Sequence, residues 1–163
     1  MTARRIRSSD FELIDRLNRD PAVVATLGGP RSPEQTTDFI DASLVHWDRH
    51  GYGIWILNES VGGAFVGRAG LRNIEIEGKP EVEALYALTP EFWRSGLASE
   101  IMSAMIRIAF DTLALASVIA LTLPSNRASR RVMEKAGLMY ERKLVHAALP
   151  HVLYRLTAAL ANF

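Results

Sequence analysis

The stretch "PEFWRSGLASE", Pro90 to Glu100, guides our interpretation of the fold. It follows a β-prone run, turns at Gly96 and leads into an apolar pattern with helical spacing. The backbone N–H groups at a helix N-terminus lack partners and carry partial positive charge, so they bind phosphate if the preceding turn lets a ligand approach. Gly96 permits this approach because it has no Cβ. The stretch predicts a phosphate-binding turn, although a plain helix cap at Ser95 would also explain it.

Side chains in the same turn add to this prediction. Arg94 supplies a positive charge, and Ser95 and Ser99 supply hydroxyl donors. The stretch matches neither G-x-x-x-x-G-K-[ST] nor G-x-G-x-x-G. A nucleotide hydrolase and a dinucleotide dehydrogenase are therefore disfavoured.

Capping residues and apolar spacing predict helices on both sides of this turn. Ser9 followed by Glu12 is a capping-box pattern, and Ser32 followed by Gln35 repeats it. The predicted helices follow Ser9, begin at Pro21, follow Ser32, run from Gly96 to about Leu113, and run from Ser125 to Gly137.

Short β-prone runs lie between and after these helices. They are "GIWIL" (53–57), "AFVGRAGLRNI" (64–74), "EVEALYAL" (81–88), "SVIALTL" (117–123), "LMYERKL" (138–144) and "HVLYRLT" (151–157). The first three predict an antiparallel meander, and the continuously apolar fourth predicts a strand buried on both faces. Because the chain has 163 residues and no linker or repeat, we expect a single domain over residues 1–163.

Composition argues against several classes of protein. With 19 basic and 18 acidic side chains the net charge is +1, which lacks the basic surplus of a nucleic-acid binder. The absence of cysteine removes disulfides and any intermediate held on a protein thiol. No secretory signal and no apolar run of membrane-spanning length is present, so we expect a cytoplasmic protein with no membrane partner.

A second group of polar residues lies in "SNRASRRVMEKAGLMY", Ser125 to Tyr140. Asn126 and Ser129 are three residues apart at a helix start, so both can point to one side of the first turn. The arginines crowding the same end are Arg127, Arg130 and Arg131. Positive charge there opposes the helix dipole, which suggests a bound anion, while a solvated charged face remains the alternative.

Together these motifs resemble a known family. "FWRSGLASE" (92–100) is similar to the acyl-CoA pyrophosphate loop of the GNAT superfamily of N-acetyltransferases. "NRASRRVMEKAGLMY" (126–140) is similar to the helix and strand that follow in the branch of ribosomal-protein N-acetyltransferases. The resemblance extends upstream through "GRAGL" (67–71) and "VEALYALTPEFW" (82–93) and is weakest before about Trp47.

The resemblance implies an α/β fold with one mixed, mostly antiparallel twisted sheet of about seven strands, flanked by about four helices. The strands at 81–88 and 117–123 would be parallel neighbours that splay apart around the pantetheine arm of acetyl-CoA. The implied donor-binding residues are Leu88, Arg94, Ser95, Gly96, Leu97, Ala98, Ser99, Asn126 and Arg130.

The chemistry also follows from the residues. Without a cysteine, the simplest route is direct attack of a neutral amine on the thioester in a ternary complex. Glu83 is the candidate base, because it shares a strand face with Leu85 and Ala87, where apolar neighbours favour proton uptake. The alternatives for Glu83 are an exposed strand position or a structural partner for an arginine.

The proton donor to the leaving thiolate is less clearly indicated. Many members of the superfamily have a tyrosine where this chain has Met133, and methionine cannot donate a proton. Ser129 is the candidate substitute, although a packing role would explain it equally well. Tyr140 and Tyr154 rank below Ser129 because they lie on late strands, where core tyrosines are common.

The sequence thus predicts an acetyl-CoA-dependent N-acetyltransferase acting on a protein N-terminus or a small-molecule amine. A non-catalytic acyl-CoA-binding or sensor domain is the alternative, favoured by Met133. We expect no metal, since the four histidines lack metal-ligand spacing and read as surface or interface side chains, and we expect a monomer or homodimer. The loop "LGGPRS" (27–32) is the best candidate for acceptor contact because its glycines permit movement.

Overall fold

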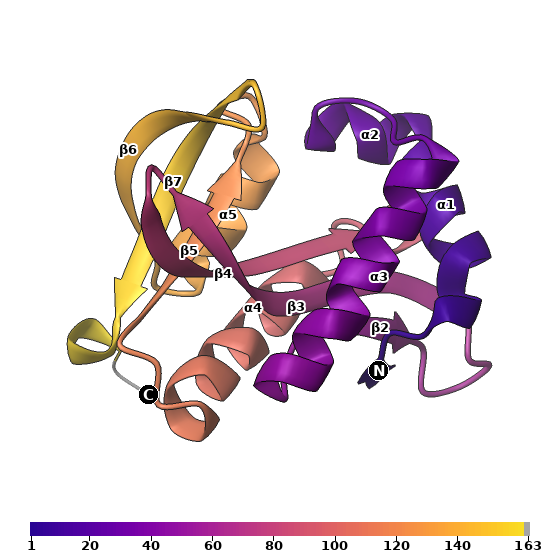
Figure 1. Ribbon diagram of the computed structural model, residues 1–163, viewed down its shortest axis with the longest axis horizontal. Coiled ribbons are helices and arrows are strands. Elements are labelled where there is room, and N and C mark those ends of the chain that lie inside the picture. Colours follow the sequence, from indigo (N-terminus) through magenta and orange to yellow (C-terminus); the bar gives the residue numbers. More distant parts are fainter. Residues whose placement is uncertain (162–163) are drawn as a thin grey trace.

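The strands within residues 1–161 form one seven-stranded sheet, with the order β1-β2-β3-β4-β5-β7-β6 (Figure 1). The computed structural model describes residues 1–161. The strands are β1 (Thr2–Arg5), β2 (Ile54–Asn58), β3 (Phe65–Ile76), β4 (Lys79–Leu88), β5 (Ser117–Thr122), β6 (Met139–His146) and β7 (Leu149–Thr157). All neighbours pair antiparallel except β4 and β5, which are parallel, so the predicted mixed and mostly antiparallel sheet is confirmed.

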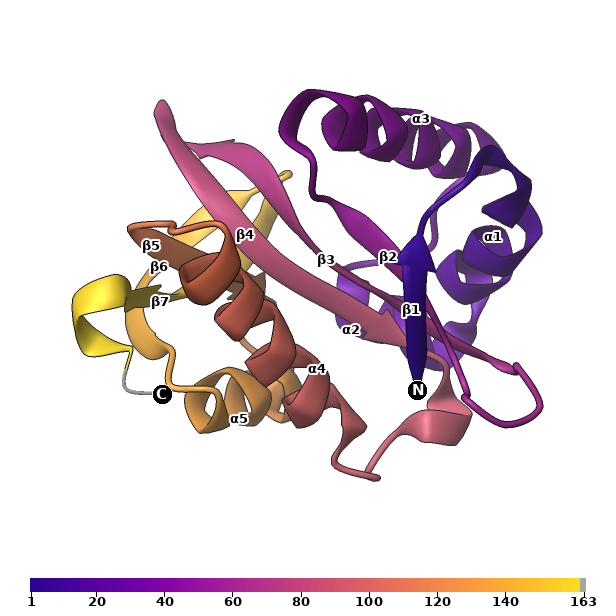
Figure 2. The ribbon, with the colours of Figure 1, turned by 90° about the horizontal axis from the view of Figure 1, so that it is seen from below.

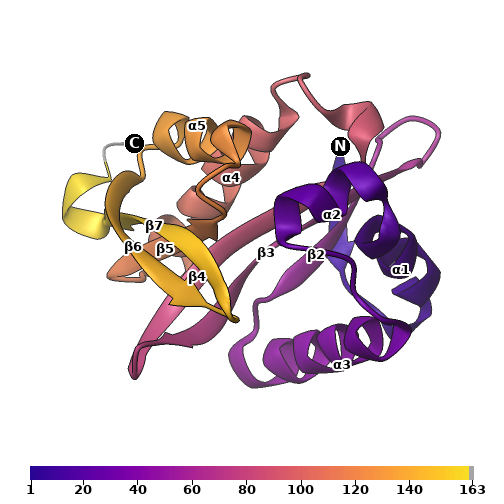
Figure 3. The same cartoon turned by 90° about the horizontal axis from the view of Figure 1, so that it is seen from above.

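Helices cover both faces of this sheet (Figure 2). Those of residues 1–161 are α1 (Phe11–Arg19), α2 (Pro21–Leu27), α3 (Pro33–His50), α4 (Leu97–Arg107) and α5 (Arg127–Lys135). Helices α1 to α3 lie on one face, and α4 and α5 on the other, as the opposite view also shows (Figure 3). A π-helical segment, Ile108–Thr112, extends α4 to the predicted end near Leu113.

Two details at the N-terminus differ from the predictions. The capping box at Ser9 does not form, because the carboxylate of Asp10 binds Arg4 at 2.5 and 2.8 Å and the Arg7 N–H at 2.7 Å. Residues Ser8–Asp10 are thereby held in a 3-10 turn, and α1 begins at Phe11. Strand β1 was not predicted, because it is short and charged and is defined by its pairing with β2 at the sheet edge.

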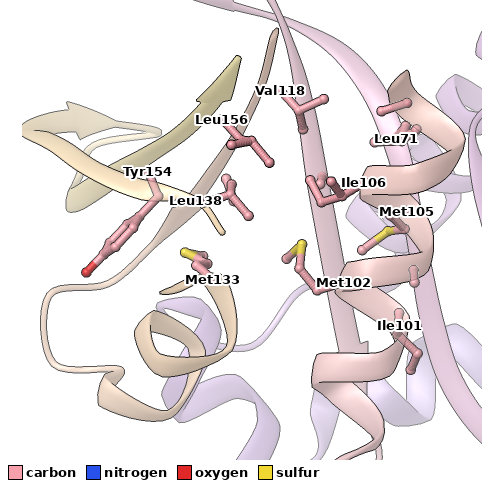
Figure 4. Packing of buried hydrophobic residues seen from close by; sticks show 14 of the residues in the cluster. Leu71, Ile101, Met102, Met105, Ile106, Val118, Met133, Leu138, Tyr154 and Leu156 are labelled. Atoms are coloured by element: carbon pink, nitrogen blue, oxygen red, sulfur yellow. The ribbon is translucent and has the colours of Figure 1, made fainter. Parts of the chain in front are cut away.

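The main core lies between the sheet and helices α4 and α5. Figure 4 shows Met102 and Ile106 of α4 facing Met133 of α5 and Val118 of β5. Each of these side chains is at most 2 % exposed. The predicted apolar side of α4 is therefore the buried one.

The strands β4 and β5 are joined at one end and separate at the other. Within the described residues their one pairing is Glu83 with Ile119, and β4 continues to Leu88 without further pairing to β5. Near this pairing, an arginine of β7 bonds to residues of three other strands, β4, β5 and β6. Arg155 donates to Glu81 at 2.8 and 2.9 Å, to Glu141 at 2.5 Å and to Ser117 at 3.3 Å. We call the gap between β4 and β5 the opening. Its closed end, where the two strands pair, is thus held together by the ion pairs of Arg155.

Candidate active site

A cavity of about 1000 Å³ lies where β4 and β5 separate. Successive strand residues point to opposite faces of a sheet, and the lining includes both faces. Arg68 and Glu83 line it on the side of α1 to α3, whereas Tyr86 and Met102 line it on the side of α4 and α5. The cavity therefore passes through the sheet, and its size is at the upper end of the roughly 300–1,000 Å³ of small-molecule sites.

The predicted phosphate-binding turn lies on the α4–α5 side. Arg94 and Gly96 adopt left-handed backbone angles, with φ of 61° and 85°. The space where a Gly96 Cβ would lie is open, with no atom within 4 Å. Among the described residues, the backbone N–H groups of residues 94–98 have no hydrogen-bond acceptor. The turn thus presents a row of free donors at the start of α4.

The side chains of the turn differ in their relation to the cavity. Arg94, Gly96, Ala98 and Ser99 line it, whereas Ser95 and Leu97 do not. The hydroxyl of Ser95 donates to the Phe92 carbonyl at 2.8 Å. Ser95 and Leu97 therefore contribute backbone rather than side-chain donors. Leu88, Phe92 and Trp93 line the cavity just before the turn, and the Leu88 carbonyl accepts a hydrogen bond from the Trp93 indole N–H at 2.8 Å.

The start of α5 faces the same cavity. The side chain of Asn126 caps the helix by accepting from the Ser129 N–H at 3.1 Å, and both residues line the cavity. The structure departs from the expectation at Arg130. Its Nε donates to the Tyr154 hydroxyl at 3.0 Å, which holds the side chain outside the lining, whereas Arg131 lines the cavity.

A tyrosine that the sequence analysis did not select lies next to Ser129. The hydroxyl of Tyr86 donates to the Ser129 hydroxyl oxygen at 3.3 Å. Burial raises the pKa of Tyr86, although the hydrogen bond to Ser129 opposes this, so the phenol stays protonated. Tyr140 and Tyr154 do not line the cavity: Tyr140 is exposed, and the buried Tyr154 donates to Glu134.

Glu83 lies on the other face and is 5 % exposed. Its Oε2 accepts a hydrogen bond from Nε of Arg72 at 2.7 Å, while Oε1 has no partner among the described residues. Glu83 therefore has an arginine partner, as one alternative proposed, and also lines the cavity, as a base must. The free Oε1 keeps one proton-accepting position open.

Two histidines of the β6–β7 hairpin lie beside Glu83. His146 and His151 line the cavity with their rings 5.7 Å apart. Burial lowers the pKa of His146, with Glu83 opposing the effect, so this ring is neutral at pH 7. Nδ1 of His151 lies 3.0 Å from the Leu149 carbonyl, which can only accept, so Nδ1 is the donor of this hydrogen bond. Both side chains are half-buried, and the sequence analysis did not select them as site residues.

The predicted acceptor loop closes this face of the cavity. Leu27, Gly28 and Arg31 line it together with Leu149 of the hairpin. A Cβ at Gly28 would overlap the Leu149 side chain, so the loop and the hairpin touch there. Within residues 1–161 there is no group of three or more His, Asp or Glu side chains that could hold a metal ion. No helix in that range is long and apolar enough to cross a bilayer.

The comparisons with known proteins agree with this geometry. Residues 1–139 match the acetyltransferase (GNAT) domain, so the chain belongs to the GNAT acetyltransferase family. It is 28% identical over 132 residues, 81% of the chain and 77% of the relative, to the uncharacterized protein YkkB of Bacillus subtilis.

Solved structures share the fold. One is an aminoglycoside acetyltransferase in complex with coenzyme A, with a TM-score of 0.78 and 16% identity over 98% of this chain and 95% of that one. Another is the ribosomal-protein-S5-alanine acetyltransferase of Vibrio fischeri, with a TM-score of 0.75 and 19% identity over 96% and 92%. The predicted GNAT family and fold are thus confirmed, whereas the branch of ribosomal-protein N-acetyltransferases stays a prediction.

Proposed function

We propose that the protein is an N-acetyltransferase that moves the acetyl group of acetyl-CoA directly onto a primary amine in a ternary complex. The observation that carries this proposal is the single cavity through the sheet. It joins the turn with free N–H donors on one face to Glu83 on the other. Two substrates that enter from opposite faces would meet between β4 and β5.

The donor would bind on the α4–α5 side. The free backbone N–H groups of residues 94–98 would receive the pyrophosphate, and the positive helix end would favour its charge. Asn126 and the Leu88 backbone would contact the pantetheine, since the Leu88 carbonyl has a second lone pair beyond its bond to Trp93. Arg94 and Arg131 line the same side and would neutralise phosphate charge.

Glu83 would take the proton that the attacking amine must lose. Its Oε1 is unpartnered, and the hydrogen bond from Arg72 to Oε2 fixes the orientation of the carboxylate. A positioned base within hydrogen-bond reach of the reacting proton contributes about 10²–10⁴-fold to a rate. Glu83 can act on the amine directly or through one water.

Ser129 would stabilise the departing thiolate. Its hydroxyl oxygen already accepts from Tyr86, so its own hydrogen is free to point at a ligand in the cavity. Met133 lines the same wall and has no proton to give. Tyr86 is then a positioning residue, because it acts through Ser129.

Acetyl-CoA binding without catalysis is the second candidate, and the buried Met133 favours it. Two measurements distinguish acetyl transfer from binding alone. The first is thermal unfolding with acetyl-CoA, CoA, NAD and ATP. The second is CoA release with a panel of amines that includes peptides with free N-termini. A ligand at about 100 times its dissociation constant adds roughly 2.7 kcal/mol, which raises Tm by about 5–10 °C for a chain of this size. We expect this rise with the CoA compounds alone, followed by turnover. A rise without turnover would support the binding domain, and no rise would reject both.

A further inference from the structure

The acceptor side of the cavity has an excess of positive charge. Arg31, Arg68 and Arg72 line it, and the one carboxylate among the lining residues is that of Glu83. Arg68 and Arg72 lie on the same face of β3, four residues apart, and Arg31 comes from the α2–α3 loop. Since Glu83 binds Arg72, the other two arginines have no carboxylate hydrogen-bonded to them within the described residues.

Arg68 is the unusual member of this group. The residue is 4 % exposed, and its Nε and Nη1 are fully buried without hydrogen-bond partners among the described residues. The ring of Phe39 covers one face of the guanidinium, 4.3 Å from its central carbon. A buried, unpaired charge costs several kcal/mol. The folded chain therefore carries a charged group whose natural partner is not supplied by the described residues.

Arg68 is still cationic at neutral pH. Burial, together with the nearby charges of Arg31 and Arg72, lowers the pKa of Arg68 to about 9, and Glu83 opposes this effect only in part. An anion that enters the cavity would offset these repulsions. A guanidinium binds a carboxylate particularly well because its parallel N–H groups match the two oxygens.

The arginines are not placed to bind the phosphates of the donor. Arg68 packs on Phe39 of α3, whereas the free N–H groups of residues 94–98 lie on the other face of the sheet, at the start of α4. An anion bound by Arg68 would therefore belong to the acceptor.

We propose that the acceptor is an amine that also carries a carboxylate, as in an α-amino acid, and that Arg68 binds this carboxylate. Arg31, which is exposed and lines the same cavity, attracts the anion. The ammonium group of the same molecule then lies toward Glu83, whose negative charge favours it. This inference rests on the proposed acetyl transfer and assigns its substrate class.

The test compares α-amino acids with their primary amides, which have the same amine and side chain but no negative charge. CoA release is measured with each acid and amide, using wild type and Arg68→Met. Arg107→Met is the matched control, because Arg107 is an exposed arginine that does not line the cavity. We expect at least one acid to exceed its amide by about tenfold or more in kcat/KM, as one charge-assisted pair implies. This preference should disappear in Arg68→Met and persist in Arg107→Met.

Binding provides a second measurement that does not need turnover. N-acetyl amino acids, the expected products, should raise the Tm of wild type more than N-acetyl amino acid amides do, and should not do so in Arg68→Met. Arg68→Met should itself unfold at no lower temperature than wild type, since it removes a charge that has no partner. Its cooperative unfolding would show that it is folded.

The outcomes separate the two proposals. Turnover of amines without a preference for acids, or a preference that survives Arg68→Met, would overturn the carboxylate inference and leave acetyl transfer standing. If no amine turns over, acetyl transfer fails, and the Tm comparison alone decides whether Arg68 binds a carboxylate.

Discussion

The two faces of the opening between β4 and β5 present different kinds of free polar group. On the α4–α5 side the free groups are backbone N–H donors from consecutive residues, 94–98. On the α1–α3 side the free groups belong to side chains, including Oε1 of Glu83 and the buried guanidinium of Arg68, among residues from distant parts of the chain. Backbone donors suit a feature shared by every acyl-CoA, whereas side chains can distinguish one acceptor from another. In the proposed function, donor binding and acceptor selection therefore depend on different parts of the chain.

Replacing Glu83 should have the largest effect. Glu83→Gln removes the proton acceptor but keeps an oxygen for the hydrogen bond from Arg72, so kcat should fall by about 10²–10³-fold. The affinity for acetyl-CoA, measured by calorimetry, should stay within about twofold, because Glu83 lies on the other face.

Glu75→Gln, at an exposed position of β3, is the control for loss of a carboxylate from this sheet. If Glu83→Gln retained more than a third of the wild-type kcat, the assignment of the base would be wrong. If it weakened acetyl-CoA binding as much as turnover, the two faces would not be independent.

Changing Gly96 should affect the opposite face. Gly96→Val places a branched side chain at φ of 85° and obstructs approach to the free N–H groups, so acetyl-CoA should bind about 10–100-fold more weakly. Gly62→Val is a matched control, because Gly62 has φ of 80° and equally open surroundings but does not line the cavity.

Gly96→Val and Gly62→Val should lower the unfolding temperature by similar amounts, which thermal unfolding checks. Only Gly96→Val should weaken acetyl-CoA binding, and kcat at saturating donor should be nearly unchanged. Equal loss of binding in the two glycine variants would show that backbone strain, and not the turn, is responsible.

The hydrogen bond between Tyr86 and Ser129 should give the smallest effect. Ser129→Ala should lower kcat by about tenfold, and Tyr86→Phe by about threefold, as expected for loss of one neutral hydrogen bond of about 1 kcal/mol. Because Tyr86 acts through Ser129, Tyr86→Phe should have no further effect in the Ser129→Ala background. Additive losses in this double-mutant cycle would give Tyr86 a direct role of its own.

The difference between the two faces also explains which site residues could be predicted from the sequence. The turn at Gly96 and the start of α5 could be predicted because their polar residues are neighbours in the chain. Glu83 could be found from strand alternation, and Tyr86, on the other face of the same strand, could have been found from the expected opening. The pair Arg68 and Phe39 could not, because nothing local in either segment indicates that α3 packs on β3 at that position.

Long-range pairing also explains the errors at the N-terminus. Ser9 has the right spacing for a cap, but the ion pair between Arg4 and Asp10 holds the chain in a different turn. The short strand β1 has little apolar pattern, and its strand conformation comes from the register with β2. Both features depend on contacts that single-segment propensities do not contain.

The ion pairs of Arg155 have a consequence for how such a protein can change over generations. Arg155, Glu81 and Glu141 hold the closed end of the opening and are absent from the cavity lining. The width of the gap is thus maintained by residues that do not line the cavity. With the acceptor bound on the α1–α3 side, as we propose, substitutions in that wall can alter selectivity while the scaffold keeps its shape, so a new acceptor can be acquired without rebuilding the proposed donor site.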